Sequence, residues 1–275
     1  LMLEYAIGFI AVACAWSNHF VQFMAGFEKV LPAWLAHPPA WLVNDVFSAG
    51  KIVAENPDTF VPTLFGIPIC INLPAILIVL LITAILVKGT KDSTKMAGIM
   101  VFVKLAVIAL FVLAGAFFVK PENWTPFAPN GVEGIFAGAF LIFFAYIGFD
   151  ALATAAEECK NPQKDLPVGI IGSLLITTVV YVLVALVLTG MQDTSTAVPL
   201  GFLKAPMAYC MSAHNMNWAA GLISVGSLAG LTSVLLVLEM AATRILYAMS
   251  RDHFISQRFQ KLHPKFKTPA LLTWT

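Results

Sequence analysis

The fold is decided by an uninterrupted apolar run at residues 168–191, which reads VGIIGSLLITTVVYVLVALVLTGM. The run contains no Asp, Glu, Lys or Arg. A helix needs about 20 mainly apolar residues to cross about 30 Å of hydrocarbon. A helix of this length that is apolar on every side is unusual in the core of a soluble protein. The run therefore predicts a membrane-spanning helix.

Five further stretches satisfy the same criterion. The six expected spans lie at residues 5–23, 69–87, 96–119, 132–156, 168–191 and 218–246. The composition agrees with them, because 59% of the 275 residues are hydrophobic and 11% are charged, whereas roughly a quarter are charged in soluble domains. We expect an all-α, polytopic integral membrane protein whose first partner is the lipid bilayer.

The basic residues divide unevenly between the loops that six spans create. One side holds Lys88, Lys91, Lys95, Lys160, Lys164, Arg244, Arg251, Arg258, Lys261, Lys265 and Lys267, and the other holds Lys29, Lys51, Lys120 and Lys204. Because Lys and Arg accumulate in cytoplasmic loops, the first span is expected to enter from the cytoplasm, across the cytoplasmic (plasma) membrane.

This topology treats residues 1–275 as one transmembrane domain. It predicts a long extracellular loop at residues 24–68 and cytoplasmic loops at 157–167 and 247–269. An apolar run, TPALLTWT, begins after the last basic loop. We expect the sequence to be truncated at both ends.

Other function classes find little support in the residues. The net charge of +1 gives no reason to expect a nucleic-acid partner. The cysteines are widely spaced and form no metal motif, and no hydrolase, metalloprotease or phosphate-loop motif occurs. We therefore expect neither an enzyme nor a bound cofactor or metal. The sequence leaves the oligomeric state open.

Lys104 is the most informative single residue. It lies eight residues into the span at 96–119, about 12 Å along a helix. A charge near the bilayer centre costs at least about 2.5–3.5 kcal/mol, so we expect this lysine to face the protein interior and to carry a proton during transport. The alternative is a lysine that extends to the cytoplasmic surface.

The span at 132–156 predicts a broken helix. Its apolar character ends at Asp150, and Gly148 just before it offers a point at which the helix can break, with Asp150 as the cap of a second half. The first half would then expose carbonyl groups that attract a cation such as an ammonium. These carbonyls belong to Phe143, Phe144, Ala145 and Tyr146. A long tilted helix with Gly148 as a packing residue remains the alternative.

Several other polar residues carry weaker signals. Thr232 and Ser233 lie in the middle of the last span, where hydroxyls commonly bond back to their own helix. Glu4 and Glu239 are interpreted as interfacial residues near cytoplasmic ends. The polar cluster at residues 17–19 is interpreted as interfacial at the outer boundary.

The sequence resembles the amino acid–polyamine–organocation transporters, and within them the cationic amino acid transporter branch with its bacterial members. The resemblance is strongest at residues 143–191, which contain an EE-x-x-NPQKDLP block followed by the long apolar run. Three further blocks agree with it: LEYAIGFIAVACAWSNHF at 3–20, VKLAVI at 103–108, and TRILYAMSRD at 243–252 followed by HPKFKTP.

The resemblance implies a leucine-transporter-like fold in which two inverted five-helix repeats surround a substrate site at the bilayer midplane. On that scheme the spans correspond to the third to eighth family helices, and TPALLTWT begins the ninth. The family's first two helices, whose broken first helix holds the substrate carboxylate, would then precede Leu1.

The resemblance also implies roles for individual residues. Phe144, Ala145 and Ile147 match the unwound segment of the sixth family helix, which binds the substrate ammonium. Lys104 matches a lysine that replaces a sodium ion in proton-coupled members, with Thr232 or Ser233 as its partner on the eighth helix.

Two further positions resemble the family pattern only in part. Asp150 stands where some antiporters have a proton-sensing glutamate and is a possible gating residue. Leu231 would line the side-chain pocket, where a bulky apolar residue disfavours arginine and favours small neutral substrates.

Three hypotheses follow from these residues. The first is proton-coupled symport of neutral amino acids by alternating access, with the proton as coupling ion. The second is exchange or facilitated diffusion of cationic amino acids. The third, from a different class, is a membrane sensor or scaffold that transports nothing.

Overall fold

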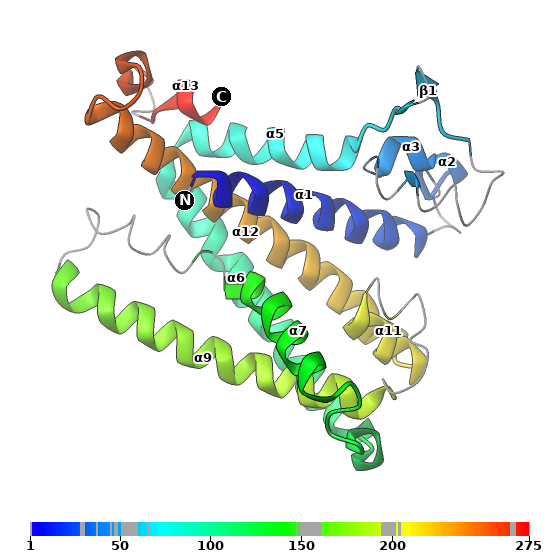
Figure 1. The fold of residues 1–275 in the computed structure, drawn as a ribbon. Helices are drawn as coiled ribbons and strands as arrows, with labels where there is room; N and C mark the ends of the chain where they lie inside the picture. Colours follow the sequence, from blue (N-terminus) through cyan, green and yellow to red (C-terminus); the bar gives the residue numbers. More distant parts are fainter. Residues whose placement is uncertain are drawn as a thin grey trace. The chain divides into compact units, whose positions relative to one another are not determined.

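The computed structural model describes residues 2–27, 31–36, 38–44, 46, 49–50, 60–64, 67–146, 148, 161–193, 202, 205–264 and 268–274. Figure 1 shows its ribbon. The chain forms two compact units, one from Leu1–Lys104 and Ser224–Thr275, the other from Leu105–Ile223. They are called unit 1 and unit 2, and each is described by itself.

Helices dominate the described residues. The longer ones are α1 (Met2–Ala25), α5 (Leu73–Lys88), α6 (Thr90–Gly115), α7 (Gly131–Phe143), α9 (Pro162–Met191) and α12 (Asn217–Arg251). The short ones are α2 (Ala33–Ala36), α3 (Ala40–Val43), α11 (Pro206–Ala213) and α13 (Ala270–Thr273). A small antiparallel ribbon joins β1 (Thr63–Leu64) to β2 (Ile67–Pro68).

An apolar helix lies at each of the six expected spans, although in the span 132–156 the described helix α7 (Gly131–Phe143) covers only the first half. Among the described residues, four helices are long and apolar enough to cross a membrane: Leu3–Ala25, Met96–Phe118, Pro162–Met191 and Asn217–Arg251. Helices α5 and α7 are apolar but have 16 and 13 residues. The side chain of Asn72 fixes the start of α5, because it accepts a hydrogen bond from the Ala75 amide at 3.2 Å.

Unit 1 packs α1, α5 and the C-terminal part of α12 around an apolar core. Its buried residues include Ala13 of α1, Ile82 of α5, and Leu235 and Leu236 of α12. In Figure 1, α1 and α5 run side by side. The segment before α13 is fastened to α5, because the Thr268 hydroxyl donates to the Val87 carbonyl at 2.8 Å.

Unit 2 packs α9 closely against the end of α6 and the residues that follow it. A methyl group on Gly115 would lie 2.6 Å from Val187 Cγ1, and one on Gly190 would lie 2.7 Å from Val119 Cγ1. Glycines at such crossings allow the helix backbones to approach closely, which is the usual packing device of membrane helices. Phe111 and other fully buried side chains fill the adjoining core.

Helix α9 begins earlier than the sequence interpretation placed it. Its first residue is Pro162, inside the segment 157–167 that was expected to be a cytoplasmic loop. Proline suits the first turn of a helix because its missing N–H is not needed there, and Asp165 in the same turn complements the positive helix end. The charged residues 164 and 165 are therefore helical, although they lie outside the apolar run.

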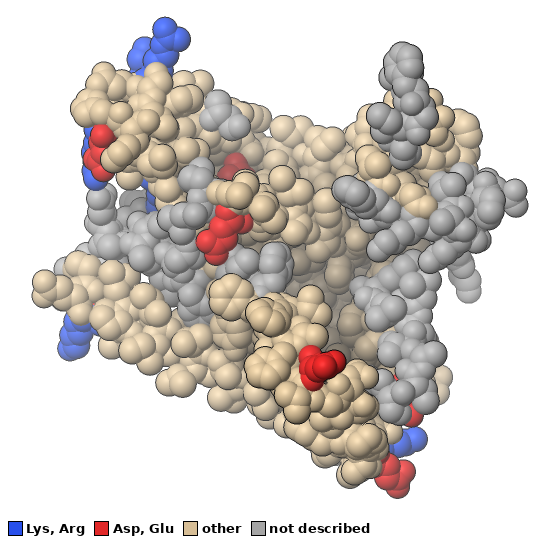
Figure 2. Space-filling view, viewed as in Figure 1, with Lys and Arg blue, Asp and Glu red and all other residues tan. Residues whose placement is uncertain are grey.

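The exposed surfaces of the long helices are apolar. On α9 the side chains of Val168, Leu175 and Ile176 are 67%, 62% and 66% exposed. Such a surface suits hydrocarbon rather than water. In unit 1, Lys and Arg gather at the end that carries the last turns of α12 (Figure 2), the end that the basic residues assign to the cytoplasm.

Candidate functional site

Lys104 lies in the middle of α6, in unit 1, and its side chain reaches α12. Its ammonium nitrogen is 3.5 Å from the Ser233 hydroxyl oxygen. The aliphatic stem passes over Gly230, where an added methyl group would lie 3.7 Å from Lys104 Cβ and Cδ. The stem is thus packed against the neighbouring helix, and the charged end meets a polar group within the bilayer span.

The hydroxyls of Thr232 and Ser233 in α12 are bonded differently. Ser233 donates to the Gly230 carbonyl at 2.7 Å, which leaves its oxygen lone pairs available to the lysine. Thr232 donates to the Leu228 carbonyl at 2.7 Å and accepts from the indole N–H of Trp16 at 2.9 Å. Of the two partners expected for Lys104, Ser233 is the one that the structure places beside it.

Trp16 was missed by the sequence interpretation. This residue stands in α1, its ring stacks on Phe20 with centroids 5.1 Å apart, and its N–H reaches across to Thr232. A buried indole N–H needs an acceptor, so a tryptophan well inside an apolar helix was the available signal. Leu231, expected to line the side-chain pocket, lies half-buried in α12 beside Thr232.

The expected substrate segment lies in unit 2. Helix α7 ends at Phe143 and is followed by a 3-10 turn, Phe144–Tyr146, and Gly148 has a φ of 103°, which glycine adopts easily. Regular helical hydrogen bonding therefore ends at the carbonyls that the sequence singled out. Ile147 and Asp150 lie outside the described residues.

Tyrosines of unit 2 hold this turn against α9. The Tyr181 hydroxyl donates to the Ala145 carbonyl at 3.0 Å, and the hydroxyls of Tyr146 and Thr178 are 3.0 Å apart. A carbonyl oxygen has two lone pairs, and the Tyr181 hydroxyl uses one of those of Ala145. The Phe143 side chain is 73% exposed. One carbonyl of the expected ammonium site is thus already engaged by the protein.

Comparison with known proteins identifies the family. The sequence matches the amino acid permease family over residues 3–275. The chain belongs to the amino acid permease family. It is therefore part of a multi-pass membrane permease, and this family consists of transporters rather than enzymes.

Three relatives of the permease illustrate the range of the family. The chain is 42% identical to the methylthioribose transporter and 41% identical to the branched-chain amino acid permease BcaP, both of Bacillus subtilis, in alignments that cover the whole chain. It is 36% identical to the chloroplastic cationic amino acid transporter 9 of Arabidopsis thaliana over 96% of the chain. These alignments cover 53%, 54% and 42% of the relatives, so the chain spans about half the length of the curated relatives it matches.

Glu239 makes a contact that its interpretation as an interfacial residue did not include. It lies twelve residues before the end of α12 at Arg251, and its side chain is half-buried. Its Oε1 accepts a hydrogen bond from the Thr83 hydroxyl of α5 at 2.7 Å. The permease thus holds a carboxyl group between two apolar helices of unit 1, which makes Glu239 part of the internal polar structure.

The described part of the permease shows no cluster of metal ligands, and its cysteine in α11 is buried. No group of three His, Cys, Asp or Glu side chains that could hold a metal ion occurs among those residues. Cys210 in α11 is fully buried in the unit 2 core, and this burial raises the pKa of its thiol to about 11. It remains a neutral packing residue at physiological pH.

Proposed function

We propose that the full-length permease is a secondary active transporter that moves neutral amino acids together with protons. The observation that carries this proposal is the contact between Lys104 and Ser233 within the membrane span. Amino acid substrates are supported by the family to which the chain belongs.

Lys104 is suited to carry the coupling proton. When charged, its ammonium donates hydrogen bonds and binds α6 to α12 through Ser233. When neutral, the amine loses most of that attraction while the cost of holding a charge inside the bilayer disappears. A lysine in this position can therefore exist in two states that hold α12 with different strength. Proton release and uptake at one nitrogen would in this way bias the helix arrangement during the transport cycle.

The preference for neutral substrates is supported by Leu231. Its side chain offers apolar surface and no acceptor, and an arginine side chain placed there would leave buried donors unpaired. The names of the relatives do not decide the substrate, because proteins named for methylthioribose and for branched-chain amino acids have almost equal identity to this chain. Cationic amino acids remain the second candidate, favoured by the plant relative.

The test is uptake by the full-length permease in proteoliposomes. Labelled alanine or leucine is supplied with and without an imposed pH gradient, and unlabelled arginine, lysine and methylthioribose are added as competitors. We expect gradient-driven uptake that arginine does not inhibit. Uptake that is equal with and without the pH gradient would refute the coupling to protons. Strong inhibition by arginine or methylthioribose would refute the assignment of neutral amino acids as substrates.

A Lys104→Ala variant separates a transporter from a sensor or scaffold. We expect this variant to fold and to lose gradient-driven uptake, because it lacks the amine that contacts Ser233 between α6 and α12. The matched control is Lys120→Ala, since Lys120 lies outside the spanning helices. A wild-type protein that binds substrate but shows no uptake under any gradient would favour the sensor.

A further inference from the structure

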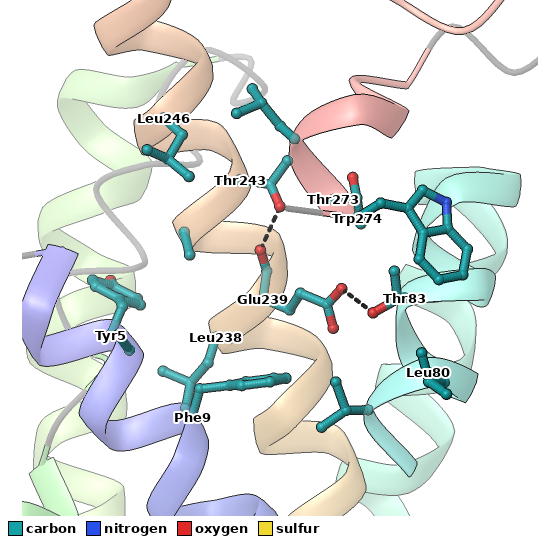
Figure 3. Close-up of a pocket in the computed structure, with 14 residues that line it drawn as sticks. Tyr5, Phe9, Leu80, Thr83, Leu238, Glu239, Thr243, Leu246, Thr273 and Trp274 are labelled. Atoms are coloured by element: carbon teal, nitrogen blue, oxygen red, sulfur yellow. Dashed lines mark hydrogen bonds between the residues drawn. The ribbon is translucent and has the colours of Figure 1, made fainter. Parts of the chain in front are cut away.

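A second polar position in unit 1 lies in a hollow of about 310 Å³ at one end of the helices. The hollow is formed by the start of α1, the second half of α5, the second half of α12, and α13 with Trp274. Figure 3 shows that most of its lining is apolar, with Phe9, Leu80 and Leu246 among the side chains. Among the described residues of this lining, Glu239 is the one that carries a carboxyl group.

The two oxygens of Glu239 have unequal surroundings. Oε1 accepts from the Thr83 hydroxyl at 2.7 Å, whereas Oε2 is buried and has no hydrogen-bond partner among the described residues. The nearby Thr243 hydroxyl is used elsewhere, because it donates to the backbone carbonyl of Glu239 at 2.8 Å (Figure 3). The carboxyl group is therefore held firmly at one oxygen and unsatisfied at the other.

Of the described side chains that line the hollow, none carries a positive charge that could compensate this carboxyl group. The titratable side chain that faces it from α1 is Tyr5, and the linings from α5 and α13 contain no titratable group. Lys88 lies five residues after Thr83 in α5, and Arg244 lies five residues after Glu239 in α12. Neither side chain lines the hollow. Glu4 of α1 is exposed and does not line it.

An unpaired carboxylate in such surroundings is costly, and the cost disappears when the group binds a proton. We infer that Glu239 is a second proton-binding site of the permease, which exchanges its proton with the cytoplasm through this hollow. In the exchange, Oε2 accepts one proton from a hydronium ion at the cytoplasmic side, which leaves a water molecule, and becomes the hydroxyl of a neutral acid. The same proton later returns to water.

The place of the hollow fits exchange with the cytoplasm. It lies at the first turn of α1 and in the C-terminal halves of α5 and α12, and the distribution of basic residues assigns these helix ends to the cytoplasmic side. Ser233, the partner of Lys104, is on the same helix six residues earlier. The inference rests on the proposed function for the use of the proton in transport, but the proton site itself does not require transport.

The first experiment measures protonation directly in the full-length permease. Infrared difference spectra between acidic and alkaline pH record the C=O stretch of protonated carboxyl groups. We expect Glu239→Gln to remove one such band, and we expect Thr83→Val to shift it, because the Oε1 hydrogen bond is lost. The control is Glu133→Gln, an exposed carboxyl group in α7, which should leave this band in place. Spectra of Glu239→Gln that equal those of the wild type would overturn the inference.

The second experiment tests whether protonation of Glu239 takes part in transport. Uptake into proteoliposomes is measured while only the pH of the compartment facing the cytoplasmic side is varied. We expect Glu239→Gln to lose the dependence of the uptake rate on that pH and to keep folding, since glutamine resembles the protonated acid in shape. A variant that keeps the wild-type pH dependence would show that the site plays no part in transport. Wild-type protein with the infrared band but without uptake would refute the proposed function alone.

Discussion

The contact between Lys104 and Ser233 makes a quantitative prediction for Ser233→Ala. The substitution removes the hydroxyl that receives the ammonium and does not weaken α12 itself, because alanine is a better helix former than serine. Hydrogen bonds to charged groups contribute about 1.5–3 kcal/mol, but the nitrogen and oxygen are 3.5 Å apart here, at the outer limit of such bonds. We therefore expect a loss of about 1 kcal/mol, roughly fivefold in an equilibrium constant.

The assay is the initial rate of leucine uptake driven by a pH gradient, measured for the full-length protein in proteoliposomes. Ser233→Ala should lower this rate by roughly fivefold if the contact holds the proton-loaded state. Gly230→Ala is the matched control, because its added methyl group makes an ordinary contact 3.7 Å from the lysine stem and leaves the hydroxyl in place. Thr232→Val should instead lower the stability, by about 0.6 and at most about 1.7 kcal/mol, since it removes the bond from Trp16. A wild-type rate for Ser233→Ala, together with a reduced rate for Thr232→Val, would refute this assignment of partners.

Two further predictions concern unit 2. Gly190→Ala should destabilise the permease by about 1–3 kcal/mol in a detergent unfolding assay, because the new methyl group would lie 2.7 Å from a Val119 carbon. The control is Gly172→Ala, which should be neutral or stabilising because no atom lies within 4 Å of the added methyl group. Equal stability of the two variants would contradict the close packing. Tyr181→Phe should change the KM for substrate more than the maximal rate, because it removes the hydrogen bond to the Ala145 carbonyl. An unchanged KM in the uptake assay would show that this carbonyl does not bind the substrate.

The sequence predicts the membrane helices well because their signal is local. An apolar run such as residues 168–191 needs no knowledge of its neighbours, since the bilayer itself selects it. Helix ends are different, because charged turns can continue a helix beyond the apolar run. Pro162 and Arg251 therefore lie outside the expected spans although both belong to helices.

The partners of polar residues are harder to predict. Thr232 and Ser233 point about 100° apart on a helix, so the sequence alone does not decide which of the two hydroxyls contacts Lys104. The choice depends on α1, which places Trp16 beside Thr232. Glu239 was within reach of the same reasoning as Lys104: it is seven residues from the end of its expected span, as Lys104 is eight from the start of its own. That position within the apolar span was the available signal for a carboxyl group with a partner on a neighbouring helix, here Thr83.

The spacing of Ser233 and Glu239 explains how one helix can serve two polar positions. Six residues advance a helix by about 9 Å and turn it by about 240°, so the two side chains leave α12 toward different neighbours. The hydrogen bonds agree with this geometry, since Ser233 meets Lys104 of α6 and Glu239 meets Thr83 of α5. A change of charge on Lys104 would therefore alter the attachment of α12 to α6, and a change of charge on Glu239 would alter its attachment to α5. A displacement of α12 would change both attachments together, so the two proposed proton sites would be coupled through this helix without direct contact between them.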